Sequence, residues 1–178
     1  AAKTKGIKPI IGVETYVAPR SMTSKEGKAD SQPFHLILLA KDYTGYQNLC
    51  RLVTDAHIDG YYYKPRIDHE HLAKYSEGLV GLSACLGGEV AKALEVDDWE
   101  LARKVAGEYG DIFGKDHFFL ELQDHGLAEQ RRLNEQLLRL SITDSLTGLY
   151  NVRHLNAELA KLIKAQRRFP NRTVSVVL

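Results

Sequence analysis

The sequence contains few cysteines and no long apolar run. Only 2 of its 178 residues are cysteine, and Cys50 and Cys85 would make a poor disulfide framework. Such a composition favours a reducing compartment, and we expect a cytoplasmic protein. No apolar run approaches the roughly 20 residues that span a bilayer, so we expect no membrane-spanning helix and no membrane partner.

The sequence also lacks a dominant charge. It has 24 Lys and Arg against 23 Asp and Glu, a net charge of +1 that gives no electrostatic case for nucleic acid. With 44% hydrophobic residues, the composition indicates one globular domain or two small pieces. There is no initiator Met, and the chain finishes on the uncapped apolar run TVSVVL, so we expect both ends to continue in a longer protein.

Strand-like and helix-like segments alternate along the chain. This alternation is typical of an α/β fold with a largely parallel sheet. A polar stretch at 19–33 predicts a surface loop, and 141–148 reads as a turn-like break. Predicted strands cover 9–17, 34–40, 79–84, 117–122 and 173–178; predicted helices cover 44–57, 68–75, 86–95, a segment from Asp97 or Asp98 to near Gly114, 127–140 and 151–169.

Two polar side chains interrupt apolar strands. Glu14 stands within IIGVETYV, where both faces of the strand look buried. A buried carboxylate is costly unless it is paired, so Glu14 is a metal ligand, half of a salt bridge, or an edge-strand residue facing water. His35 shares a face of FHLILLA with Ile37 and Leu39, which fits a hydrogen-bonded core histidine or a metal ligand.

Cys85 ends the run LVGLSAC, directly before two glycines and a helix. We expect its side chain at the carboxyl end of a strand, where α/β barrels carry their chemistry; the alternative is a small core residue. Glu14, His35 and Cys85 together would suit a borderline ion such as Zn, Mn or Fe, although their wide spacing forms no local motif. Cys50 falls on an apolar helical face, and we expect it in the core.

Three further polar clusters have ordinary structural explanations. His69 and His71 stand at positions i and i+2 of a short helix, where side chains diverge, so we expect them to be solvated. Gln123–Gly126 (QDHG) follows a strand and opens a helix, which suits a ligand site or a plain capped turn. Basic residues of the last predicted helix could contact phosphate or line a solvated face: Lys161, Lys164, Arg167 and Arg168.

Most of the chain carries a specific ordered series of segments, namely GIKPIIGVETYVAP, FHLILLAKDYTGYQNLCRLV, GYYYKPRID, SEGLVGLSACLGGEV and FFLELQDHGLAEQRRLNEQLLRL. Through them, residues 1 to about 139 resemble the PHP domain of bacterial DNA polymerase III alpha subunits. The resemblance implies a distorted barrel of β/α units around a metal cluster, which hydrolyses phosphoester bonds in members that keep the site and is a structural support in others. It also implies DNA and replisome subunits as partners of the intact protein.

The resemblance places Glu14, His35 and Cys85 at metal-binding positions of that family. The family's opening His-x-His motif, its Asp-His segment and its closing Asp-x-His motif have no matching positions here, and the polymerase palm is absent. Three ligands cannot hold several metal ions, so the resemblance implies weak or no metal uptake and no nuclease activity by this chain. The catalytic residues stay unknown.

A different signature begins near the end of the chain. Asp144–Asn151 (DSLTGLYN), with Arg153, His154 and Leu155, resembles the opening of a GGDEF domain, the diguanylate cyclase family. The terminal TVSVVL resembles that family's first strand. The metal-binding Asp and the Gly-Gly-Asp-Glu-Phe loop are missing, so the resemblance implies no cyclase activity and no nucleotide-binding residue.

These resemblances predict two segments that meet within a helix. Residues 1–139 would be a partial PHP domain and 140–178 an N-terminal fragment of a GGDEF domain. The predicted fold class is therefore α/β, a partial PHP-like distorted β/α barrel followed by a helix and strand of a GGDEF-like domain. The expected function is a fragment of the polymerase PHP region, inactive alone; the alternatives are a truncated diguanylate cyclase-type signalling protein and a catalytically inert chimera.

Overall fold

The computed structural model describes residues 3–114, 116–123 and 126–142. By its internal contacts the chain divides into two compact units, Ala1–Leu137 and Leu138–Leu178. The site discussed below lies in the first unit. The helix predicted at 151–169, the strand predicted at 173–178 and the whole GGDEF-like signature lie outside the described residues.

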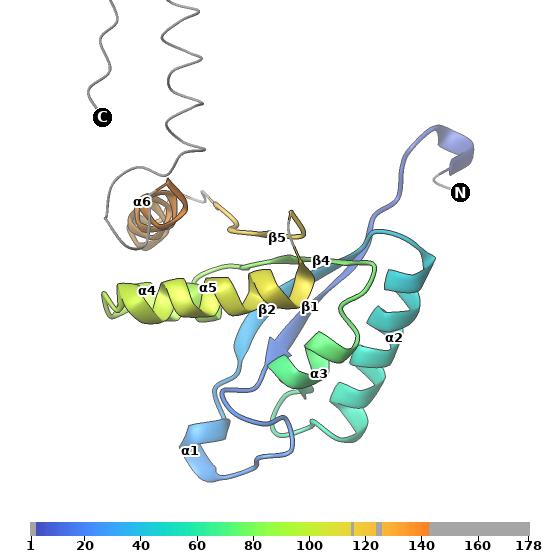
Figure 1. Cartoon of the computed structure of the whole chain (residues 1–178), viewed down its shortest axis with the longest axis horizontal. Coiled ribbons are helices and arrows are strands. Elements are labelled where there is room, and N and C mark those ends of the chain that lie inside the picture. The colour runs from blue at the N-terminus through green and yellow to red at the C-terminus, as the bar shows by residue number, and fades with distance from the viewer. Residues whose placement is uncertain (1–2, 115, 124–125, 143–178) are drawn as a thin grey trace, which may run out of the picture. The chain divides into compact units, whose positions relative to one another are not determined.

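The described elements follow the predicted alternation closely (Figure 1). The strands are β1 (Ile11–Val17), β2 (Phe34–Ala40), β3 (Arg66–Ile67), β4 (Leu79–Leu82) and β5 (Phe118–Phe119). After the 3-10 turn η1 (Lys3–Lys5), the helices are α1 (Gly27–Asp30), α2 (Tyr43–Ile58), α3 (His69–Lys74), α4 (Glu89–Glu95), α5 (Trp99–Phe113) and α6 (Ala128–Ile142).

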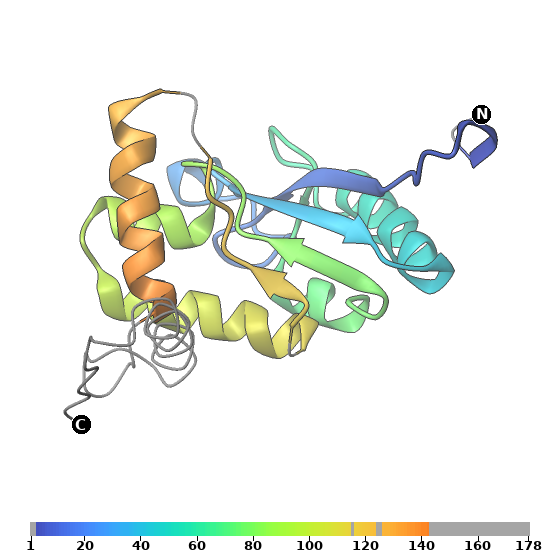
Figure 2. The same cartoon turned by 90° about the horizontal axis from the view of Figure 1, so that it is seen from above.

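The strands form an open mixed sheet in the order β3-β1-β2-β4-β5. Figure 2 shows β1, β2, β4 and β5 side by side. The prediction of a largely parallel sheet is wrong at its centre, because β2 is antiparallel to both β1 and β4, whereas β1–β3 and β4–β5 are parallel. The connection between β1 and β2, residues 18–33, contains only the short α1 and does not cross back over the sheet. β2 therefore starts at the end where β1 stops and runs in the opposite direction.

One face of this sheet carries the core. Leu36 and Leu38 of β2 are buried, and their cross-strand neighbours Thr15 and Gly81 share that face. Phe113 of α5 packs so closely over Gly81 that a Cβ there would lie 2.5 Å from its ring. In Figure 1, α2, α3 and α5 lie on the same side of the sheet. The opposite face carries the alternate residues, Glu14 and His35 among them.

Two local predictions about helices need correction. Cys50 is exposed on α2, whose buried face is formed by Leu49, Leu52 and Ala56, so it is not a core residue. Ser141, the first residue of the predicted turn-like break, still belongs to α6, and the rest of that break lies outside the described residues. Among the described residues, none of the helices is long and apolar enough to cross a membrane.

The predicted surface loop at 19–33 is polar and largely exposed, but it is firmly anchored. The side chain of Arg66 is completely buried beneath it. Asp30 is also buried and pairs with Arg20 at 2.7 Å; hydrogen bonds from Arg20 hold the pKa of Asp30 below its ordinary value. The guanidinium of Arg66 donates to four main-chain oxygens, those of Met22, Ser24, Asp30 and Gly60.

Candidate functional site

The structure brings Glu14, His35 and Cys85 together on the face of the sheet opposite the core. Nδ1 of His35 lies 2.7 Å from Oε1 of Glu14 and 3.7 Å from Sγ of Cys85. β1 supplies the carboxylate, β2 supplies the imidazole, and the segment after β4 supplies the thiol. The three side chains therefore meet, as the sequence hypothesis required. Their binding of a metal stays a prediction.

Strand register explains the first two positions. His35 pairs with Tyr16, and Glu14 pairs with Ile37, so Glu14 and His35 are diagonal neighbours on one face. The side chain of Glu14 is 52% exposed, and therefore the expectation that both faces of this strand are buried is wrong. Glu14 lies within ion-pair distance of His35, which fits both the salt-bridge and the metal-ligand alternatives. His35 is likewise only partly buried, at 31% exposed, so it is not an enclosed core histidine.

A strained turn directs Cys85 toward the imidazole. Ala84, directly before it, has φ +58°, the left-handed region that residues other than glycine rarely adopt. The N–H of Gly87 then donates to Sγ at 3.5 Å, and the N–H of His35 donates to the carbonyl of Gly87 at 2.9 Å. A Cβ on Gly87 would lie 3.0 Å from the ring of His35. Ring and thiol are thus positioned by the same backbone segment.

The donor set has the chemistry of a site for a borderline metal. Carboxylate oxygen, imidazole nitrogen and thiolate sulfur suit Zn, Mn or Fe. Glu14 and Cys85 both approach the same nitrogen of His35, which must be free of its proton to bind an ion. In the described part of the chain, no group of three or more His, Cys, Asp or Glu side chains has the arrangement of a metal site.

A buried carboxylate oxygen belongs to a residue that lines a cavity with Cys85, and the sequence analysis did not identify this residue. Oε2 of Glu121, just after β5, is buried and has no hydrogen-bond partner within the described ranges. Its other oxygen accepts from Nε2 of Gln123 at 2.7 Å, and Glu121 lines a small cavity with Cys85. The main-chain N–H of Gln123 also donates to Oδ1 of Asn134, and Nδ2 of Asn134 donates to the carbonyl of Gln123. Asp124 and His125 of the QDHG motif lie outside the described residues.

His69 is not solvated, contrary to expectation. Its Nε2 lies 2.9 Å from Oε2 of Glu89, and its Nδ1 lies 3.4 Å from Glu108. The hydroxyl of Tyr109 donates to the same oxygen of Glu89 at 2.8 Å. The hydrogen bond with Glu89 raises the pKa of His69, and burial raises the pKa of Tyr109 well above its ordinary value. This cluster connects α3 to α4 and α5.

His71 also finds a partner, on the other side of α3. Its Nε2 lies 3.0 Å from Oδ2 of Asp55 on α2, and the same oxygen accepts from Nε of Arg51 at 2.9 Å. The divergence predicted for positions 69 and 71 is confirmed, but both side chains reach neighbouring helices. Asp55 and Glu89 could not be found from sequence, because nothing local marks either as a histidine partner.

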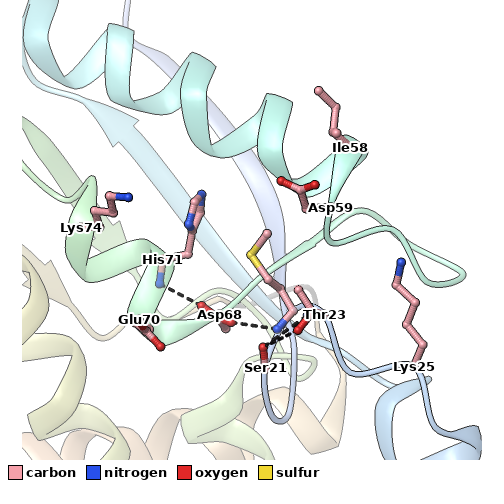
Figure 3. A pocket seen from close by; sticks show the side chains of 10 residues that line it. Ser21, Thr23, Lys25, Ile58, Asp59, Asp68, Glu70, His71 and Lys74 are labelled. Carbon is pink, nitrogen blue, oxygen red and sulfur yellow. Dashed lines mark hydrogen bonds between the residues drawn. The ribbon is translucent and has the colours of Figure 1, made fainter.

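A separate hollow of about 550 Å³ lies between the β1–β2 loop, α2 and α3 (Figure 3). Asp68, in its lining, accepts from the main-chain N–H groups of Met22 and His71, both at 2.8 Å. The side chain of His71, which also lines the hollow, is already paired with Asp55. The other lining residues include side chains of both charges; these residues are Ser21, Thr23, Lys25, Ile58, Asp59, Glu70 and Lys74. This hollow includes none of Glu14, His35 and Cys85.

Comparison with known proteins supports the first of the two resemblances, that to the PHP domain of DNA polymerase III alpha subunits. The chain is 50% identical over 138 residues to the DNA polymerase III subunit alpha of Thermus aquaticus, covering 76% of this chain and 11% of that protein. It is 47% identical over 132 residues to the subunit of Deinococcus radiodurans, covering 72% and 10%. For Borreliella burgdorferi the identity is 41% over 160 residues, covering 88% and 14%.

The chain thus spans only a small part of the length of these relatives. The family match covers much more of this chain than the chain covers of those relatives, because the model of the PHP domain matches residues 1–125. That range includes all three side chains that meet at His35. The chain therefore belongs to the PHP domain family.

Proposed function

We propose that this chain contributes part of a metal-dependent phosphoesterase site to a longer protein of DNA replication. The observation that supports this is the convergence of Glu14 and Cys85 on Nδ1 of His35, from three separate elements of the sheet. The relatives are DNA polymerase III alpha subunits, so the intact protein would be cytoplasmic and have DNA and replisome subunits as partners.

The three side chains alone would hold an ion weakly. Structural Zn sites are closed by four protein ligands, and phosphoester hydrolysis by paired ions needs more than three. The remaining ligands would come from parts of the intact protein that have no counterpart here. We therefore expect this chain to hydrolyse no phosphodiester by itself, and to act as a structural support wherever the full ligand set is not restored.

Cobalt titration tests the metal assignment directly, because Co²⁺ substitutes for Zn²⁺ and gives a thiolate charge-transfer band. The expected result is a band that appears only at a large excess of Co²⁺ and is lost in Cys85→Ala and His35→Ala. Cys50→Ala is the matched control, because Cys50 is the exposed cysteine of α2 and should leave the band unchanged.

Two results would contradict the proposal in different ways. Loss of the band in Cys50→Ala, or its persistence in Cys85→Ala, would place the metal elsewhere. One ion per chain that survives dialysis and is lost in Cys85→Ala would instead show a complete site, and the expectation of weak binding would be wrong.

For the last part of the chain, the division into segments 1–139 and 140–178 and the GGDEF-like opening stay predictions. The match to the Borreliella burgdorferi subunit covers a larger share of this chain than residues 1–139 make up, so similarity to the polymerase continues beyond position 139. The family match lies entirely within the first segment. Neither observation favours a signalling function, and we propose none.

A further inference from the structure

The outer edge of β1 is only partly covered by β3. On one side β2 pairs with the whole of Ile11–Val17, whereas on the other side β3 pairs only with Tyr16 and Val17. Among the described residues, no other strand lies along the rest of that edge. Gly12 and Glu14 are exposed there. Such an edge presents main-chain N–H and C=O groups that a further strand can bind.

The chain just before β1 is exposed and lies in line with this edge. Figure 2 shows it running outward beyond the end of the sheet. Ile7 and Ile10 are 62% and 69% exposed, and Ile11, the first residue of β1, is 50% exposed. An exposed apolar segment that continues an open strand edge favours the addition of another strand, because pairing covers both the main chain and the apolar side chains.

The hydrogen bonds of β1 show which residues face this edge. The N–H of Ala18 donates to the carbonyl of Ile67 in β3 at 2.7 Å, on the side of the open edge. Because the main-chain groups of a strand alternate between its two sides, Gly12 and Glu14 also present theirs to this edge. Pro9 stands at an odd-numbered position, so its missing N–H removes no hydrogen bond there.

One register between two copies of the chain matches both charge and apolar surface. When two β1 segments run antiparallel and cross at their first residue, Lys8 of one copy lies opposite Glu14 of the other. The ammonium then meets a carboxylate that is 52% exposed. In the same register Ile10 lies opposite Gly12. A Cβ on Gly12 would lie 2.5 Å from Cδ2 of Leu39, so the incoming isoleucine packs against that leucine.

We propose that two copies of this chain form a symmetric dimer through the open edge of β1, in the register that pairs Lys8 with Glu14. The inference goes beyond the proposed function and needs no metal. Symmetry repeats each pair, which gives about eight main-chain hydrogen bonds. Pairing stops where Tyr16 would face Gly6 of the other copy, because β3 occupies the edge there and the φ of +71° at Gly6 turns the chain aside. An interface this short is of the weak class, so we expect a dissociation constant in the micromolar range.

Sedimentation equilibrium of the full 178-residue chain, in buffer containing EDTA, tests the dimer. Lys8→Glu should weaken it about tenfold, because like charges then lie opposite each other in both copies of the pair. Combining Lys8→Glu with Glu14→Lys exchanges the two charges and should restore the wild-type dissociation constant. Lys5→Glu is the matched control: it makes the same charge change in η1, outside the paired segment, and should leave the dimer unchanged.

Ile10→Pro tests the main-chain pairing separately. It removes an N–H that faces the edge, at an exposed position before β1, so the variant should melt like the wild-type monomer and fail to dimerise. A wild-type chain that stays monomeric at every concentration, assemblies larger than two, a dimer that persists in Ile10→Pro, or failure of the exchanged charge pair to restore it would overturn the proposal. Because EDTA removes any metal, this result is independent of the cobalt titration, and either proposal can fail without the other.

Discussion

Sγ of Cys85 lies 3.7 Å from Nδ1 of His35, although the two residues are 50 positions apart in the sequence. Main-chain contacts largely hold the two residues together. The segment after β4 accepts a hydrogen bond from the main-chain N–H of His35 and places Gly87 against its ring. The glycines of this segment are therefore part of the site's construction.

Replacing Gly88 with alanine should destabilise the chain by about 1–3 kcal/mol. Its φ of −70° would suit alanine, but a Cβ there would lie 2.1 Å from the carbonyl oxygen of Ser83, so the backbone must shift. Gly107→Ala is the control with the opposite sign. Gly107 stands inside α5 with open space around it, and alanine should stabilise by about 0.5–1 kcal/mol. Urea unfolding followed by circular dichroism measures both; equal midpoints would contradict the steric argument.

Arg66→Lys should cost roughly 2–4 kcal/mol, a large loss for a substitution that keeps the charge. The guanidinium of Arg66 serves four main-chain oxygens in a buried position, and an ammonium cannot reach all of them. Arg51→Lys is the comparison, because the side chain of Arg51 is 60% exposed and should matter far less. Similar unfolding midpoints for the two variants would show that the loop at 19–33 does not depend on Arg66.

The contact between His69 and Glu89 should make stability depend on pH. Hydrogen bonding to Glu89 raises the pKa of His69, so the folded chain holds this proton more tightly than the unfolded chain, whose histidine pKa is about 6.5. The stabilisation is fully present below that value and is lost as pH rises through the raised pKa. The melting temperature of the wild type should therefore fall over this window.

His69→Gln should flatten that part of the pH profile, and Glu89→Gln should do the same. Glu89→Gln should also destabilise by about 1–2 kcal/mol near pH 6, because it weakens the acceptor shared by His69 and Tyr109. His57→Gln, which replaces an exposed histidine of α2 that bonds the carbonyl of Val53 rather than Glu89, is the matched substitution for comparison. A wild-type profile that matches His69→Gln throughout would show that this contact is not coupled to folding.

The sequence predicted only some of the side chains that the structure places at the candidate site. Glu14, His35 and Cys85 attract notice because each interrupts or ends an apolar strand, and local pattern is sufficient to detect that. The buried Oε2 of Glu121 carries no such signal, since FFLEL reads as an ordinary strand end.

Local sequence by itself determined where β2 lies, where α5 begins at its Asp98 cap and stops before Gly114, and which three side chains break the apolar pattern. Those features depend on side-chain periodicity and capping within a few residues. Only the tertiary structure decided the direction of β2, the exposure of Glu14 and Cys50, and the partners of His69 and His71. Each of these depends on contacts between segments far apart in the chain, and local periodicity contains no information about which segments meet.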